Sequence, residues 1–118
     1  MSNSSGRFIT PQTTGSVQVT NTGYTILYTV PSNTYSIFNV SLTNTSASAV
    51  TVKLAMCTTA NVNSPLASDF IESLTTIVGY GVFERTGLVM QAGLNIVCQA
   101  SAASTVNATV YGIETSTQ

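Results

Sequence analysis

The side chains of this chain that could carry out chemistry are few. Its 118 residues include three Lys or Arg, four Asp or Glu, and no histidine. Histidine is the most common general base and metal ligand in proteins, so the usual centre of acid–base and metal chemistry is missing. The charged positions are Arg7, Lys53, Asp69, Glu72, Glu84, Arg85 and Glu114.

The remaining reactive groups do not form a catalytic pattern. Glycoside hydrolysis needs two carboxylates that flank a cleft, and Asp69 and Glu72 are the only carboxylate pair with a close, turn-like spacing. Cys57 and Cys98 lack the paired spacing of zinc ligands. The Gly79-Tyr-Gly81 segment precedes no helical pattern, so it does not resemble a phosphate-binding loop. We therefore predict no enzymatic activity, no catalytic residues, no cofactor and no metal site.

The expected compartment is a reducing one. The first residues contain no apolar run after a basic start, which a secretory signal requires. No stretch approaches the roughly 18 apolar residues of a membrane span. We expect synthesis in the cytoplasm, where disulfides are rare, and hence two reduced, half-buried thiols. A bridge between them would require neighbouring strands.

The polar surface is built from uncharged groups. The chain has 15 Ser, 20 Thr and 9 Asn, whereas 43% of its residues are hydrophobic, enough for the core of one domain. A formal net charge of −1 provides no field for nucleic acid or for an anionic membrane. A net charge near zero also favours self-association. The composition indicates a building block or binding module with a homo-oligomeric state.

Hydrophobic residues alternate with polar ones along most of the chain. Phe38, Val40 and Leu42 share one face of a predicted strand over residues 35–43, with the period of two that a half-buried strand shows. Similar segments recur about every ten residues, separated by Gly, Ser, Asn and Pro. This pattern predicts an all-β, antiparallel β-sandwich of about 7–9 short strands, jelly-roll or Ig-like. The expected strands cover residues 25–30, 35–43, 50–56, 69–74, 82–86, 88–90, 94–100 and 105–114.

Two local predictions concern the middle of the chain. Strands 35–43 and 50–56 flank the polar turn 44–48, which favours a hairpin. Residues 69–74 fit either a strand, which we favour, or one helical turn with Asp69 as N-cap.

The domain organisation is an N-terminal arm followed by one globular unit. Residues 1–16 are predicted to be an extended arm, and residues 17–118 a single β-sandwich domain. The arm contains the apolar pair Phe8 and Ile9, which is either part of a flexible terminus or a contact with a neighbouring subunit.

Three further features are candidate interface positions. Glu84 and Arg85 precede the expected Gly87 turn and form either a structural ion pair or turn cap, or a contact across a subunit boundary. Asn61 and Asn63 lie in the irregular segment 58–67. The five tyrosines could form a sugar-stacking platform, although tyrosines at strand ends usually cover a small core. The candidate interface residues are Phe8, Ile9, Asn61, Asn63, Glu84 and Arg85.

Several segments have a distinctive order without being chemical motifs. They are Tyr28 to Pro31, Ser36-Ile-Phe-Asn-Val-Ser-Leu-Thr-Asn44, Val50-Thr-Val-Lys-Leu54, Asp69-Phe-Ile-Glu72, Val82-Phe-Glu-Arg-Thr-Gly-Leu-Val-Met-Gln-Ala-Gly93 and Val110-Tyr-Gly-Ile-Glu114. Over residues 24–114 the chain resembles a group of small virion structural proteins of tailed bacteriophages, notably phages of marine and freshwater bacteria.

The resemblance implies a non-enzymatic β-sandwich module present in many copies on a phage particle, often as a trimer. Its expected place is the capsid surface of the virion, as a decoration or cement protein whose partner is the major capsid protein or another virion protein. Alternatives are a tail fibre, neck or baseplate module that binds a receptor or glycan, a pilus-type subunit, and a small hydrolytic domain. The missing signal sequence argues against the pilus subunit, and the missing histidine against the hydrolase.

Overall fold

The computed structural model describes residues 5–10, 17–19 and 23–117, with side chains from residue 23 onward. These residues contain nine strands and two short 3₁₀ turns, joined by loops. The strands are β1 (Ser5–Thr10), β2 (Val17–Val19), β3 (Thr25–Thr29), β4 (Thr34–Asn44), β5 (Val50–Thr58), β6 (Phe70–Ile77), β7 (Val82–Gln91), β8 (Leu94–Ala100) and β9 (Val106–Ser116), and the 3₁₀ turns are η1 (Thr59–Asn61) and η2 (Ala67–Asp69).

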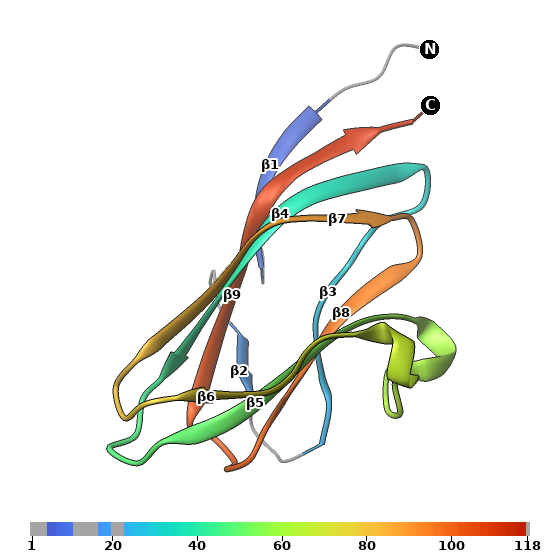
Figure 1. Ribbon diagram of the computed structural model, residues 1–118. Coiled ribbons are helices and arrows are strands. Elements are labelled where there is room, and N and C mark those ends of the chain that lie inside the picture. The colour runs from blue at the N-terminus through green and yellow to red at the C-terminus, as the bar shows by residue number, and fades with distance from the viewer. Residues whose placement is uncertain (1–4, 11–16, 20–22, 118) are drawn as a thin grey trace.

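The strands form two sheets that pack as a sandwich (Figure 1). One sheet has the order β1-β9-β4-β7, with β2 also paired to β9, and the other has the order β3-β8-β5-β6. All pairs are antiparallel. If β1 and β2 are counted as one edge strand, the eight strands can be renumbered 1 to 8 in chain order. The two sheets then have the orders 1-8-3-6 and 2-7-4-5, which is the arrangement of a jelly roll. The predicted antiparallel sandwich is therefore confirmed, with jelly-roll rather than Ig-like topology.

The facing sides of the two sheets enclose one hydrophobic core. Phe38, Val40 and Leu42 are buried on the predicted face of β4. On β5, Val50, Val52 and Leu54 are buried, and Met56 packs against the core from a partly exposed position. Two further strands contribute buried residues to the same core. They are Ile96 and Cys98 on β8, and Val106 and Ala108 on β9.

The predicted hairpin between residues 35–43 and 50–56 is wrong. β4 pairs with β7 and β9, whereas β5 pairs with β6 and β8. The polar segment between β4 and β5 therefore carries the chain from one sheet to the other. Alternating strands on both sides of a short polar turn have the same sequence pattern in either arrangement, so the pattern alone could not distinguish them.

Asn44 holds this crossover in place. Its buried side-chain amide donates to the carbonyls of Ser48 at 2.8 Å and Ile77 at 3.1 Å, and its Oδ1 accepts from the Ser46 N–H at 2.9 Å. A buried amide is stable only when such partners are present. This residue thus ties the start of the crossover to the end of β6.

A smaller apolar cluster lies on the outer side of β5 and β8. Ala55, Cys57 and Val97 are buried there beneath Tyr24, Val62 and Phe70. Val62 comes from the segment between β5 and β6, Phe70 is the first residue of β6, and Tyr24 precedes β3, so three separate parts of the chain form this cover.

Of the two alternatives for residues 69–74, the strand is observed and the helical turn with Asp69 as N-cap is not. Asp69 ends the 3₁₀ turn η2, and β6 begins at Phe70. Asp69 is not the N-cap residue, because its carboxylate accepts the N–H of Leu66, three residues earlier, at 2.8 Å. The strand assignment is confirmed from Phe70 onward.

The break expected at Gly87 is a bulge within one continuous strand. β7 runs from Val82 to Gln91, and its register with β4 shifts between Phe38 and Val40. Gly87 has a φ of 70°, which glycine adopts at little cost. Its N–H donates to the Asn39 Oδ1 at 2.9 Å. Glu84 and Arg85 consequently lie inside a strand and not at its end.

The two cysteines are free and buried, as predicted. Their strands, β5 and β8, are neighbours, but Cys98 faces the main core and Cys57 the outer cluster. Opposite faces of a sheet cannot be bridged. Burial raises the pKa of Cys98 to about 12, so this thiol is unreactive at neutral pH.

A polar cluster links the two sheets at one end. The Tyr28 hydroxyl, on β3, contacts the Ser36 Oγ at 2.6 Å and donates to the Glu114 carboxylate on β9. Burial and the neighbouring Glu114 raise the pKa of Tyr28, so the phenol stays a donor.

We expect Tyr28→Phe to lower the free energy of unfolding by about 1–3 kcal/mol, because Ser36 and Glu114 lose a partner. Urea denaturation measures this, with Tyr80→Phe, whose side chain is 71% exposed, as the matched control; equal effects of the two changes would contradict the assignment.

Gly112 makes a second specific demand on the β4–β9 pair. A Cβ at this position would lie 2.2 Å from the Ile37 carbonyl oxygen and 2.6 Å from the Phe38 Cα. We expect Gly112→Ala to destabilise the protein by about 1–3 kcal/mol, since backbone atoms must move. The measurement is thermal or urea unfolding. Ile113→Ala, at the next position and 47% exposed, should have a smaller effect, and the reverse order would show that the strands do not approach as described.

Candidate assembly surface

The outer face of the β9-β4-β7 sheet carries a row of exposed apolar side chains. Ile37 of β4 lies opposite Val89 of β7 on one side and opposite Ile113 of β9 on the other. Their exposed fractions are 49%, 59% and 47%, and Tyr35, two residues before Ile37 on the same face, is 38% exposed. We call Tyr35, Ile37, Val89 and Ile113 the outer row. Aliphatic groups that meet on one rung of a sheet form a contiguous patch, which marks an interaction site more often than scattered residues do.

The outer row results from the sequence of β4 itself. Its inward positions are occupied by Ser36, Phe38, Val40, Leu42 and Asn44, all buried. The alternate positions should then be polar, and they are so at Asn39, Ser41 and Thr43. At Tyr35 and Ile37 the alternation fails, since these outward positions are apolar although Phe38, on the inward face beside Ile37, is apolar as well. A strand with two apolar faces is expected where both faces are covered.

Next to the outer row the surface becomes polar but remains almost uncharged. The Tyr111 hydroxyl, on β9, donates to the Glu84 carboxylate on β7 at 3.4 Å. Asn39 lies between them on β4 and pairs with Tyr111. Its side-chain oxygen, Oδ1, accepts the Gly87 N–H. A hydrogen-bonding margin whose one described carboxylate is Glu84 imposes less like-charge repulsion on a partner than a densely charged surface would.

Glu84 and Arg85 point to opposite faces of β7. Glu84 is exposed on the outer face, whereas Arg85 forms an ion pair with Glu72 of β6 and donates to the Ile71 carbonyl at 3.4 Å. β6 and β7 are edge strands of different sheets, so this pair closes one side of the sandwich. Of the two interpretations of Arg85, the structure shows the structural ion pair, with Glu72 and not Glu84 as its partner.

The electrostatics of this ion pair depend on a third residue. The Thr75 hydroxyl, 2.5 Å from the Glu72 carboxylate, is the main cause that lowers the pKa of Glu72, and the Arg85 guanidinium adds to it. Because the pKa of Glu72 is lower in the folded protein than its ordinary value of 4.5, the ionised form stabilises the fold above that value. The stabilisation is lost as the pH falls through the lower, folded-state pKa.

The remaining predicted interface residues lie elsewhere. Phe8 and Ile9 belong to β1, where they pair with Gly112 and Tyr111 of β9; their side chains are outside the described residues. The expected arm is thus an edge strand over residues 5–10, and residues 1–4 and 11–16 are also outside the described part.

Asn61 and Asn63 are in the segment that covers the outer side of β5. Asn61 donates to the Thr58 hydroxyl at 3.2 Å, and Asn63 is exposed. The six predicted positions therefore do not form one site, because Asn61 and Asn63 lie over one sheet and Glu84 over the other.

Sequence reasoning missed the outer row. Ile37 and Val89 were assigned to strands but not to a surface, because which strands are neighbours was unknown. The failure of alternation at Tyr35 and Ile37 was the available signal. The tyrosines, in contrast, do not form a platform among the described residues. Tyr24 packs on Phe70 and Tyr28 on Phe38, each in a different apolar cluster.

Comparison of the sequence with models of protein families found no match, and comparison with curated proteins found none either. Within the described ranges, no group of three or more His, Cys, Asp or Glu side chains is placed to hold a metal ion. No helix in the same part of the chain has the length and apolar character that a membrane crossing requires.

The pH dependence of stability tests the ion pair. We expect Glu72→Gln to lower the free energy of unfolding at pH 7 by about 0.5–1 kcal/mol, the size of a partly exposed pair. The difference from the unmodified protein should shrink as the pH falls below 4.5 and through the lower, folded-state pKa of Glu72, because the carboxylate then becomes protonated. Urea unfolding at several pH values measures this, and Thr75→Val should show part of the same effect. A difference for Glu72→Gln that stays constant with pH would contradict the assignment.

Proposed function

We propose that this chain is a non-enzymatic structural protein of a bacteriophage virion, which forms homo-oligomers, with the trimer favoured, and decorates the assembled capsid. The outer row on a sandwich with almost no charge is the observation that carries this proposal. The resemblance of residues 24–114 to small virion proteins supports the virion part. In the proposal, the host cytoplasm is the place of synthesis and the capsid surface the final location.

The outer row can contribute favourable free energy to association. Fully burying a Val, Leu or Ile side chain contributes about 1.5–3 kcal/mol, and these side chains are about half exposed. Each would then contribute about 1 kcal/mol when covered. Several such contributions, with hydrogen bonds from the polar margin, are compatible with a specific but reversible contact between copies.

An open strand edge supplies a second kind of contact. β6 pairs only with β5, and its residues from Ser73 to Ile77 carry no charge. β7, at the edge of the other sheet, has Glu84, Arg85 and the bulge at Gly87, which are features that protect an edge from strand addition. The uncharged part of β6 is therefore better suited than β7 to receive a strand from a capsid protein.

A decoration protein stabilises a capsid by mass action. If it binds the assembled shell and not the free subunits, the shell becomes more stable. When the decoration protein is in excess, this free energy grows with the logarithm of the ratio of its concentration to its Kd for the shell. No catalytic group is needed for this effect. A neutral surface rich in Ser, Thr and Asn also meets a large protein surface with little desolvation of charge.

Imaging of intact particles tests the proposed location. We expect density for this chain at regular positions of the capsid lattice, and capsids without it should disassemble at lower temperature or under milder denaturing conditions. Density confined to the tail, neck or fibres would replace the capsid role with a tail module.

The oligomeric state tests the role of the outer row. We expect Ile37→Ser to reduce the apparent association constant at least about fivefold, the equivalent of about 1 kcal/mol, as measured by analytical ultracentrifugation. Leu66→Ser is the matched control, because Leu66 is 56% exposed but lies outside the row. A strict monomer, or equal effects of both changes, would contradict the proposal.

A further inference from the structure

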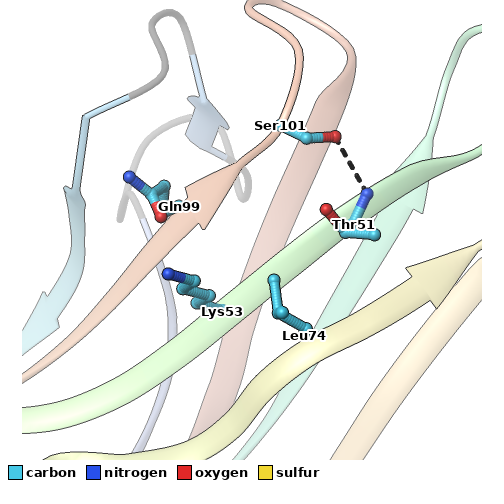
Figure 2. A pocket seen from close by; sticks show the side chains of 5 residues that line it. All are labelled: Thr51, Lys53, Leu74, Gln99 and Ser101. Carbon is cyan, nitrogen blue, oxygen red and sulfur yellow. Dashed lines mark hydrogen bonds between the residues drawn. The ribbon is translucent and has the colours of Figure 1, made fainter. Parts of the chain in front are cut away.

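A hollow of about 400 Å³ lies on the outer face of the other sheet (Figure 2). Its lining comes from three adjacent strands and the turn after β8, and consists of Thr51, Lys53, Leu74, Gln99 and Ser101. This face is opposite the one with the outer row, so the hollow is separate from that row, and it shares Leu74 with the β6 segment proposed above for strand addition.

Lys53 lacks a carboxylate partner among the described residues. The four carboxylates have other contacts there: Asp69 accepts from the Leu66 N–H, Glu72 pairs with Arg85, Glu84 accepts from Tyr111, and Glu114 accepts from Tyr28. An ammonium group in a concave site with no fixed counter-charge attracts an anionic ligand.

The groups around Lys53 are suited to hydroxyl-bearing ligands. Gln99 lies opposite Lys53 on β8, and Figure 2 shows the two side chains next to each other. The Ser101 Oγ accepts the Thr51 N–H at 3.0 Å, so its own proton can be donated outward. An amide and two hydroxyls on neighbouring strands thus surround one cation.

Leu74 adds an aliphatic wall through an irregularity in β6. Val52 pairs with Thr75 but Leu54 pairs with Glu72, so Ser73 and Leu74 together lie opposite Lys53. Such a bulge redirects side chains, and Leu74, 69% exposed, lines the hollow beside Lys53 (Figure 2). The C–H face of a sugar ring can pack on such a side chain.

We infer that this hollow binds a saccharide that carries a carboxylate, of the uronic acid class. The carboxylate lies at Lys53, the ring hydroxyls at Gln99, Thr51 and Ser101, and the ring face at Leu74. A volume of about 400 Å³ is within the range of small-ligand sites.

Other anions fit less well. A peptide lying over β5, in the middle of the hollow, would have no main chain to pair with, because β5 is already paired on both sides. A strand added to the open edge of β6 would lie in the plane of the sheet, beside the hollow and not in it. Nucleic acid requires several cations along its backbone, and Lys53 is the only cation in the lining.

The test is an NMR titration of the full-length ¹⁵N-labelled protein with trigalacturonic acid and with its methyl ester. We expect saturable shifts confined to the residues around Lys53, at least about fivefold weaker binding of the uncharged ester, and the same loss for Lys53→Gln. Lys53→Arg, the matched control, keeps the charge and should bind within about twofold of the unmodified protein.

Three results would overturn the inference. They are no saturable binding of the acid, equal binding of acid and ester, and binding of a short oligoglutamate peptide as tight as that of the saccharide. The amide spectrum of each variant reports whether it is folded. Because the protein is titrated without capsids, failure here leaves the capsid proposal standing, and failure of the capsid experiments leaves this site untouched.

Discussion

The antiparallel pairing of β4 with β9 is the interaction on which the rest of the structure depends. The two strands pair over their entire length, from Thr34 opposite Ser116 to Asn44 opposite Val106. β1, β2 and β7 attach to them and complete the sheet. Their inward side chains form about a third of the core, and their outward side chains form most of the outer row. The pair joins segments about seventy residues apart in the chain, so it forms only when the whole domain folds.

Three polar contacts link segments that are distant in the sequence and surround this pair. Tyr28 reaches Glu114 and Ser36 from the opposite sheet, Arg85 reaches Glu72 across the open side, and Asn44 holds the crossover to β6. In a chain with seven charges, two of the four carboxylates, Glu72 and Glu114, therefore hold contacts between the two sheets. The scarcity of charge then has a direct consequence for function, because the outer surfaces are left to apolar and neutral polar groups.

The structure explains the residue types in two of the segments on which the resemblance to virion proteins rests. In Tyr111-Gly-Ile-Glu114, Tyr111 contacts Glu84, Gly112 permits the close approach to β4, Ile113 belongs to the outer row, and Glu114 accepts from Tyr28. In the segment from Glu84 to Gly87, Arg85 closes the sandwich and Gly87 forms the bulge. These residue types thus reflect the packing of one sandwich and its outer face.

The sequence by itself determined the all-β class, the inward faces of β4 and β5, most turns and the poverty of charge, because alternation and turn residues are local properties. It could not determine that residues 35–43 and 50–56 belong to different sheets, that Arg85 pairs with Glu72, or that residues 82–91 form one bulged strand. Those outcomes depend on which strands become neighbours. Ile37, Val89 and Ile113 are separate hydrophobic residues in the chain, and only the tertiary structure makes them one surface, since strand pairing places distant positions on a single rung.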